Sequence, residues 1–119
     1  MRPTLRICWV LPFVAEVLTG CSGSLCGNDK IQAYRSPDGS MTAYLFRRSC
    51  GATTGFSTHV SLLPAGRTLP NDGGNVLSAG NEQVILIEWA APQVLQITGV
   101  SEPVYQRHDK VYSVSVQFR

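Results

Sequence analysis

Short stretches in which apolar and polar side chains alternate constrain the fold of this chain more than any other feature. In residues 111–119, the even positions from Tyr112 to Phe118 carry apolar or aromatic side chains, and the odd positions between them carry Ser or Gln. A period of two is typical of a β-strand with one buried face. After residue 21, no segment keeps a period of 3.6 residues over three helical turns. The sequence therefore predicts an all-β domain.

We expect strands at six places, which are residues 30–35, 41–48, 56–63, 84–89, 94–98 and 111–119. Both faces of 41–48 are fairly apolar, which predicts a central strand. The nearly continuous apolar run at 84–89 predicts a strand that is covered on both faces. Short strands joined by short turns favour antiparallel pairing. The expected fold is a small antiparallel meander that forms a sandwich or an open barrel.

The connections between these strands contain the residues that favour turns. In Ser36-Pro37-Asp38-Gly39, proline presets φ, the aspartate side chain can bond the backbone, and glycine tolerates a positive φ. Residues 64–80 are rich in Gly, Pro, Asn and Asp and predict a long surface loop. Residues 99–109 are polar, and Pro103 interrupts them. We expect no regular structure in the last two segments.

The N-terminus has the three-part plan of a secretory signal. Arg2 and Arg6 provide positive charge, residues 7–15 are apolar, and a junction of small residues follows. The apolar run is shorter than the roughly 18 residues that span a bilayer, so we expect this segment to be cleaved. The predicted organisation is a signal peptide at 1–20, a tether at 21–29 and one β domain at 30–119.

The junction Leu18-Thr19-Gly20-Cys21 resembles the lipobox of bacterial lipoproteins. This resemblance implies a diacylglycerol on the thiol of Cys21 and a fatty acid, such as palmitate, on the new N-terminus. Ser22 follows the cysteine, and by resemblance to the sorting rule of enteric bacteria it favours the outer membrane over the inner. Glu16 departs from the pattern, because it places a charge near the end of the apolar run. The implied location is the periplasmic side of the cell envelope.

The remaining cysteines predict a disulfide. Cys8 lies in the signal peptide and Cys21 carries the lipid, which leaves Cys26 and Cys50. Two thiols in an oxidising compartment favour one bond, which would contribute about 3 kcal/mol by constraining the unfolded chain. The alternative is a metal or redox pair, but the two cysteines lack C-x-x-C spacing and a histidine at ligand spacing.

The charges of the mature chain do not indicate a nucleic-acid partner. The chain has ten Lys and Arg against eight Asp and Glu, and Arg2, Arg6 and Glu16 fall within the signal peptide. The remaining basic residues are scattered, and the longest basic run is Arg47-Arg48. A nucleic-acid surface would show a basic stripe.

Two segments carry a resemblance to known families. Ser36-Pro37-Asp38-Gly39 and the stretch from Cys50 to Thr58, Cys-Gly-Ala-Thr-Thr-Gly-Phe-Ser-Thr, resemble an uncharacterised family of small bacterial lipoproteins. The first turn, together with Trp89-Ala90-Ala91-Pro92, also resembles hairpins of TolB-type propeller blades. The resemblance supports the β fold and implies no catalytic residues.

Neither histidine belongs to a catalytic or metal-binding pattern. His59 shares a strand face with Ser57 and Ser61, and we expect that face to be solvated. His108-Asp109 lies in a polar turn, and a metal site would need two or three further ligands. We therefore expect no catalytic residues, no metal and no cofactor. A small hydrolase would require His59 or His108 to meet a Ser or Cys and a carboxylate in space.

The loop after Cys50 is a possible binding loop, because Gly51, Thr53, Thr54 and Gly55 offer hydroxyl and backbone N–H groups. The alternative is a tight connection pinned by the disulfide, in which the threonines bond their own backbone. The expected function is that of a lipid-anchored, non-catalytic module that binds an envelope protein. The alternatives are an inhibitor or immunity-type lipoprotein and a small hydrolase.

Overall fold

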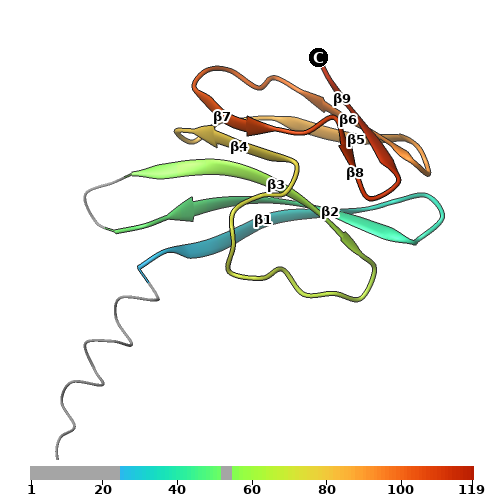
Figure 1. Cartoon of the computed structure of the whole chain (residues 1–119), viewed down its shortest axis with the longest axis horizontal. Helices are drawn as coiled ribbons and strands as arrows, with labels where there is room; N and C mark the ends of the chain where they lie inside the picture. The colour runs from blue at the N-terminus through green and yellow to red at the C-terminus, as the bar shows by residue number, and fades with distance from the viewer. Residues whose placement is uncertain (1–24, 52–54) are drawn as a thin grey trace, which may run out of the picture.

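The computed structural model describes residues 25–51 and 55–119, and in this part of the chain all regular elements are strands (Figure 1). They are β1 (Gly27–Arg35), β2 (Met41–Ser49), β3 (Phe56–Pro64), β4 (Leu77–Gly80), β5 (Leu86–Ala91), β6 (Val94–Thr98), β7 (Val104–Arg107), β8 (Lys110–Val111) and β9 (Val114–Phe118). No helix in the described residues is long and apolar enough to cross a membrane.

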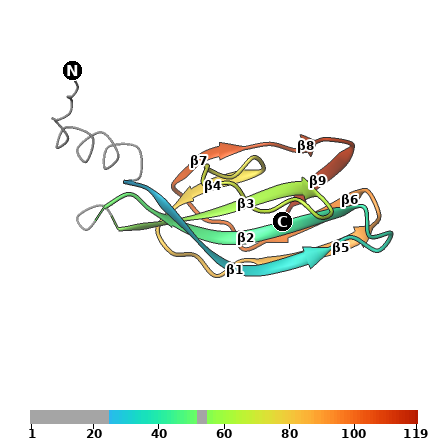
Figure 2. The same ribbon diagram turned by 90° about the horizontal axis from the view of Figure 1, so that it is seen from below.

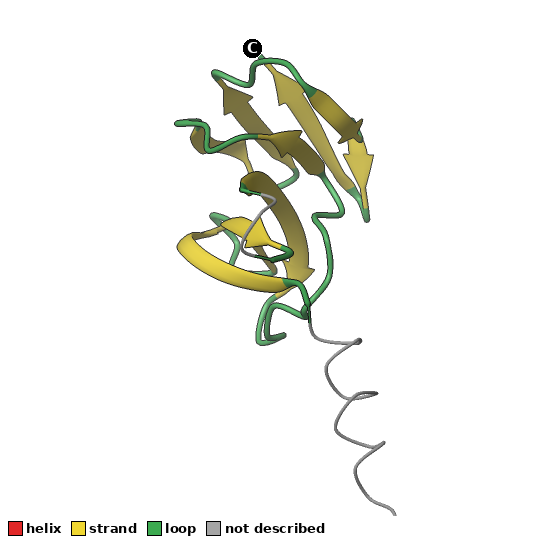
Figure 3. Cartoon of the chain, turned by 90° about the vertical axis from the view of Figure 1, so that its left-hand side faces the viewer, coloured by secondary structure: helices red, strands yellow, loops and turns green. Residues whose placement is uncertain are grey.

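The strands form two sheets that pack face to face (Figures 2 and 3). The first sheet has the order β1-β2-β3-β4-β7, and the second has the order β5-β6-β9-β8. This arrangement confirms the expected all-β sandwich. Strands 41–48, 56–63 and 94–98 lie within a residue of their predicted bounds.

The core lies between the two sheets. β2 is an interior strand of its sheet, as expected, with β1 and β3 on either side. It has buried side chains on both of its faces. Trp89 closes one open side of the sandwich, because its Nε1–H donates to the carbonyl of Tyr34 at 2.9 Å across the two sheets. The buried cluster between the sheets consists of Met41, Ala43, Leu45, Val60, Leu62, Val76, Leu77, Ala79, Ile85, Ile87, Leu95, Ile97, Val114 and Val116.

The turn at 36–39 has the predicted mechanism. The Gly39 N–H donates to the carbonyl of Ser36 at 2.9 Å, and Gly39 has a φ of 75°. The carboxylate of Asp38 accepts from the backbone N–H of Ser40 and from the hydroxyls of Ser36 and Ser40. These hydrogen bonds hold the pKa of Asp38 below its usual range. The turn fixes the register of the β1–β2 hairpin.

The topology departs from a simple meander at two places. β6 pairs with β9 in parallel, with Leu95 opposite Val116. β7 returns to the first sheet beside β4, and the corner at His108 then leads the chain into the second sheet. These pairings join strands that are distant in the sequence, and local patterns carry no information about them.

The loop predicted at 64–80 ends in strand β4, and the segment predicted as irregular at 99–109 contains β7. Leu77 and Ala79 are fully buried and pair with β3 and β7. β4 has only four residues, which is too short for alternation to stand out among the neighbouring glycines.

Two strand predictions were wrong in detail. Residues 84–89 are not covered on both faces, since Ile85 and Ile87 are buried whereas Val84 and Leu86 are 98% and 54% exposed. No third layer covers the outer face of β5 in the described residues. Residues 111–119 form two strands, because Tyr112 has a φ of 54°, turns the chain between β8 and β9 and is itself exposed.

The first strand begins earlier than expected. β1 starts at Gly27, within the stretch assigned to the tether, and Gly27 already pairs with Ser49 of β2. The described part of the chain is therefore structured from the residue after Cys26.

Candidate functional site

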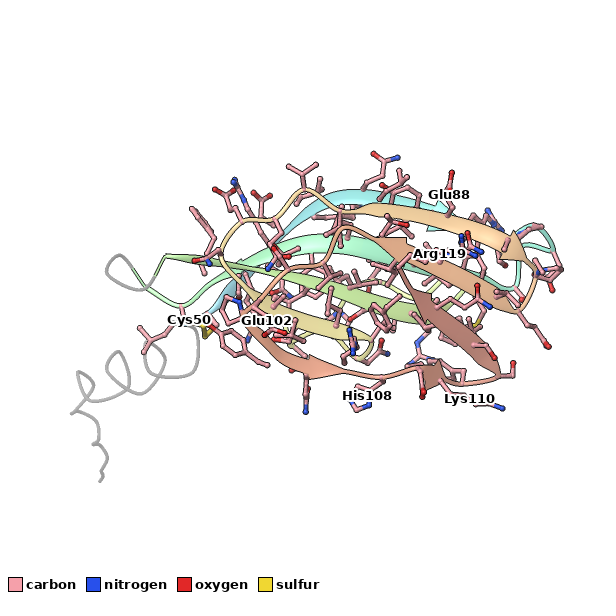
Figure 4. The ribbon with its side chains drawn as sticks, turned by 90° about the horizontal axis from the view of Figure 1, so that it is seen from above. Cys50, Glu88, Glu102, His108, Lys110 and Arg119 are labelled. Carbon is pink, nitrogen blue, oxygen red and sulfur yellow. A yellow bond between two sulfur atoms is a disulfide. The ribbon has the colours of Figure 1, made fainter. Side chains whose placement is uncertain are left out.

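The disulfide lies at one end of the sandwich, where β1 begins and β2 ends. Cys26 is bonded to Cys50, as predicted, just beyond the last paired residues Gly27 and Ser49. Figure 4 labels Cys50 at this end and places Lys110 toward the other. The bond closes the β1–β2 hairpin at the end opposite its turn.

Only part of the predicted binding loop lies in the described structure. Gly51 and Gly55 have φ values of 134° and 68°, which favour glycine over residues with a Cβ. Thr53 and Thr54 lie outside the described residues, as does the predicted lipidation site Cys21. The ligand-binding role of this loop stays a prediction.

The structure brings Ser57 and His59 into contact. The Oγ of Ser57 lies 2.7 Å from the Nε2 of His59 on the outer face of β3. The prediction that this face is solvated was wrong, since His59 and Ser61 are each 4% exposed. Residues 65–76, which we call the covering segment, fold over this face and exclude water from it.

The hydrogen bonds of His59 fix its tautomer. The backbone N–H of Gly74 donates to Nδ1 at 3.0 Å. Because Nδ1 accepts, the proton of the neutral ring lies on Nε2, and Nε2–H donates to Ser57. The ring also stacks on buried Phe46, with 5.3 Å between centroids.

This direction of donation is the reverse of what a hydrolase needs. A catalytic histidine accepts the proton of its serine through one nitrogen and donates through the other to a carboxylate. Here a backbone N–H occupies the place of the carboxylate. Ser57 Oγ instead sits 3.4 Å from the carbonyl of Arg48, which accepts its proton. The Ser57–His59 pair therefore fastens the covering segment and does not activate a nucleophile.

Sequence reasoning missed the residue that attaches the covering segment to β3. The side chain of Asn75 accepts from the N–H of Leu62 at 2.7 Å and donates to its carbonyl at 2.8 Å. The amide thereby occupies the edge of β3 beyond the end of β4. The N–H of Asn75 also donates to Ser61 Oγ. An asparagine after two glycines is equally typical of a turn, so no sequence signal identified this role.

A small cleft opens beside this network at the disulfide end. It has a volume of about 200 Å³ and is lined by Arg48, Cys50, Gly55, Phe56, Ser57 and Tyr105. The Nη1 of Arg48 donates to the side-chain oxygens of Asn28 at 2.7 Å and Asn71 at 3.1 Å. Among the described residues, no carboxylate pairs with Arg48, so its positive charge is uncompensated at the cleft.

The second histidine lies elsewhere. His108 is exposed at the corner between β7 and β8, in an open depression of about 510 Å³ lined also by Arg107, Asp109, Val116 and Phe118. The hydrogen-bond partners of the His59 ring among the described residues are Ser57 and Gly74, and His108 is not one of them. The two histidines therefore form no common site. Within 25–51 and 55–119, no three His, Cys, Asp or Glu side chains are grouped to hold a metal ion.

The stability of the domain should depend on pH through His59. Burial, and secondarily the charge of Arg48, lower the pKa of His59. The unfolded histidine has a pKa near 6.5, so the folded state binds its proton less readily than the unfolded state. The stabilisation is complete above that value and is lost as the pH falls toward the pKa of the folded state. We expect urea midpoints to fall between about pH 7.5 and pH 5.

Two glutamine variants check this pH dependence. His59→Gln should flatten the dependence in this range, because the titrating group is gone, and His108→Gln should retain it. A dependence that survives in His59→Gln would assign it to other groups.

No family model matches the sequence, and neither a curated protein nor a solved structure is significantly similar to it.

Proposed function

We propose that this protein is a lipid-anchored component of the bacterial cell envelope, whose β domain binds another envelope component without catalysing a reaction. The observation that supports this most directly is the Cys26–Cys50 bond. Disulfides persist in oxidising compartments and are rare in the cytosol. Export of the chain to an oxidising compartment would thus maintain this bond.

The anchor is the second part of the proposal. The lipobox-like junction ends at Cys21, only five residues before Cys26. Two or three acyl chains hold a protein stably, since each buried CH₂ contributes about 0.8 kcal/mol and one chain alone is marginal. Acylation at Cys21 would keep the domain next to the membrane surface, and Ser22 favours the outer membrane.

A binding role accounts for the described residues better than catalysis. The serine and histidine that meet have the wrong tautomer for nucleophilic attack. The polar groups of the outer face bond to the covering segment, which makes that face a rigid support. Rigid β supports that present loops are suited to recognition.

The anchor is tested with two cysteine variants of the full chain expressed in a Gram-negative bacterium. The parent and Cys8→Ser should be cut before Cys21, gain the mass of the acyl chains and partition into detergent. Cys21→Ser should lose the acyl mass and leave the detergent phase. An intact, unacylated N-terminus on soluble parent protein would contradict the proposal.

The binding role is tested by crosslinking in the native envelope. The anchored parent should yield a discrete crosslinked species that a soluble Cys21→Ser protein does not yield at the same level. Turnover of ester or peptide substrates that is lost in Ser57→Ala would contradict the non-catalytic role.

A further inference from the structure

The short tether determines which end of the domain faces the lipid. Cys26 is five residues after Cys21 and is held to Cys50 by the disulfide. Five residues of fully extended chain reach at most roughly 17 Å. β2 has nine residues and is roughly 30 Å long. An acyl group on Cys21 thus keeps the disulfide end within reach of the bilayer, and the opposite end lies one strand length away.

The disulfide end has the composition of a surface that contacts lipid. We call Leu25, Arg48, Phe56 and Tyr105 the anchor-end surface. Leu25 is 65% exposed, Phe56 42% and Tyr105 66%. Large apolar side chains with this exposure lose water contact when they enter an apolar layer, and tyrosine is favoured where one end of the ring stays wet. Aromatic rings of this kind are enriched at membrane interfaces.

Arg48 adds the charge that a headgroup would meet. Arg48 lines the 200 Å³ cleft together with Phe56 and Tyr105, and its guanidinium has no carboxylate partner among the described residues. Among the described residues, its Nη1 donates to the side-chain oxygens of two neutral amides, those of Asn28 and Asn71. A planar guanidinium with several donors matches the oxygens of a phosphodiester.

The neighbouring arginine is not available in this way. Arg47 forms ion pairs with Asp29 and Glu82, and its guanidinium lies over the ring of Phe56 with 4.5 Å to the centroid. It therefore holds the Phe56 ring in place at the rim and leaves the uncompensated charge to Arg48.

We propose that the anchor-end surface rests on the phospholipid headgroup layer, with Phe56 and Tyr105 in the interfacial region and Arg48 bonded to phosphodiester oxygens. This inference rests on the lipid anchor proposed above. It gives the domain a fixed orientation, with the turn at 36–39 and the β8–β9 corner pointing away from the membrane (Figure 2).

Tryptophan reporters test the orientation. Phe56→Trp and Tyr105→Trp place a reporter in the surface, and Tyr112→Trp is a matched control because Tyr112 is 55% exposed near the opposite end. Each variant is expressed as the full chain, and its processed, acylated form is reconstituted into vesicles of phosphatidylethanolamine and phosphatidylglycerol, with and without lipids brominated near the carbonyl. Bromine quenches on contact, and subtraction of the parent spectrum removes the contribution of Trp89.

We expect brominated lipid to cause loss of emission at positions 56 and 105 and none at 112. In the Phe56→Trp background, Arg48→Gln should reduce the loss and Arg48→Lys should largely preserve it. Equal loss at 56 and 112, or no loss at 56, would overturn the inference, and an unchanged loss in Arg48→Gln would overturn the role of Arg48.

The intact mass of the same samples separates the two proposals. If the protein is acylated but the Trp at position 56 is not quenched, the membrane contact of the anchor-end surface is contradicted and the lipid anchor is not. Protein without acyl mass overturns both proposals, because residues 21–26 then do not connect the domain to the bilayer.

Discussion

Replacing both Cys26 and Cys50 with alanine is expected to lower the free energy of unfolding by about 3 kcal/mol. The bond links residues 24 apart in sequence, so it constrains the unfolded chain while the native hairpin keeps its other contacts. Small domains have only about 5–15 kcal/mol of stability in total, so this is a large fraction. Urea unfolding of the parent, of the reduced parent and of the variant measures it.

The loss should be visible locally as well as globally. β1 is an edge strand whose residues are mostly exposed, and it is held by β2 alone within its sheet. Without the bond, the end at Gly27 and Ser49 is free to fray. Amide exchange should therefore accelerate first in β1, with β6 protected until global unfolding.

The reduced parent serves as the control. It should match the variant in both midpoint and exchange, since both lack only the crosslink. A variant as stable as the oxidised parent would show that the hairpin contacts, and not the bond, hold this end together.

Local patterns predicted the strands whose own residues decide their structure. β9 alternates along its length, and Val114 and Val116 are buried as expected. The turn at 36–39 contains its own hydrogen-bond acceptor in Asp38, so it needs no distant partner. In both cases the determining interaction lies within a few residues of sequence.

The features that sequence reasoning missed depend on distant contacts. The face that carries His59 and Ser61 is buried because Gly74 bonds to His59 from 15 residues away and Asn75 bonds to Ser61 from 14 residues away. β4 is a strand because it pairs with β3 and β7. Its four residues are too few to show an alternation of apolar and polar side chains. Sequence reasoning placed Ser57 and His59 on one face, but only the position of the Gly74 N–H reveals that the His59 ring donates to Ser57 and does not accept its proton.

Gly74→Ala is expected to destabilise the domain by about 3 kcal/mol, because it forces the covering segment away from β3. A Cβ at this position would lie against the backbone carbonyl oxygens of Val60 and Leu77, and neither can move without breaking the ladder between β3 and β4. The N–H that donates to His59 would be displaced as well. The buried imidazole would then lack its donor, which adds to the cost of overpacking.

The adjacent glycine provides the matched control. A Cβ at Gly73 would meet the His59 ring at 3.7 and 3.8 Å, which is ordinary van der Waals contact. Neither glycine has a positive φ, so the two alanine substitutions differ in space and not in backbone strain. Gly73→Ala should therefore leave the urea midpoint nearly unchanged and keep its pH dependence.

The comparison also tests the link between the covering segment and His59. When the segment lifts in Gly74→Ala, water reaches the imidazole, and its pKa should rise toward that of the unfolded chain. The fall in stability below neutral pH should then diminish in Gly74→Ala. Equal midpoints for the two alanine variants would mean that the segment does not depend on its close approach to β3, and that the burial of His59 has another cause.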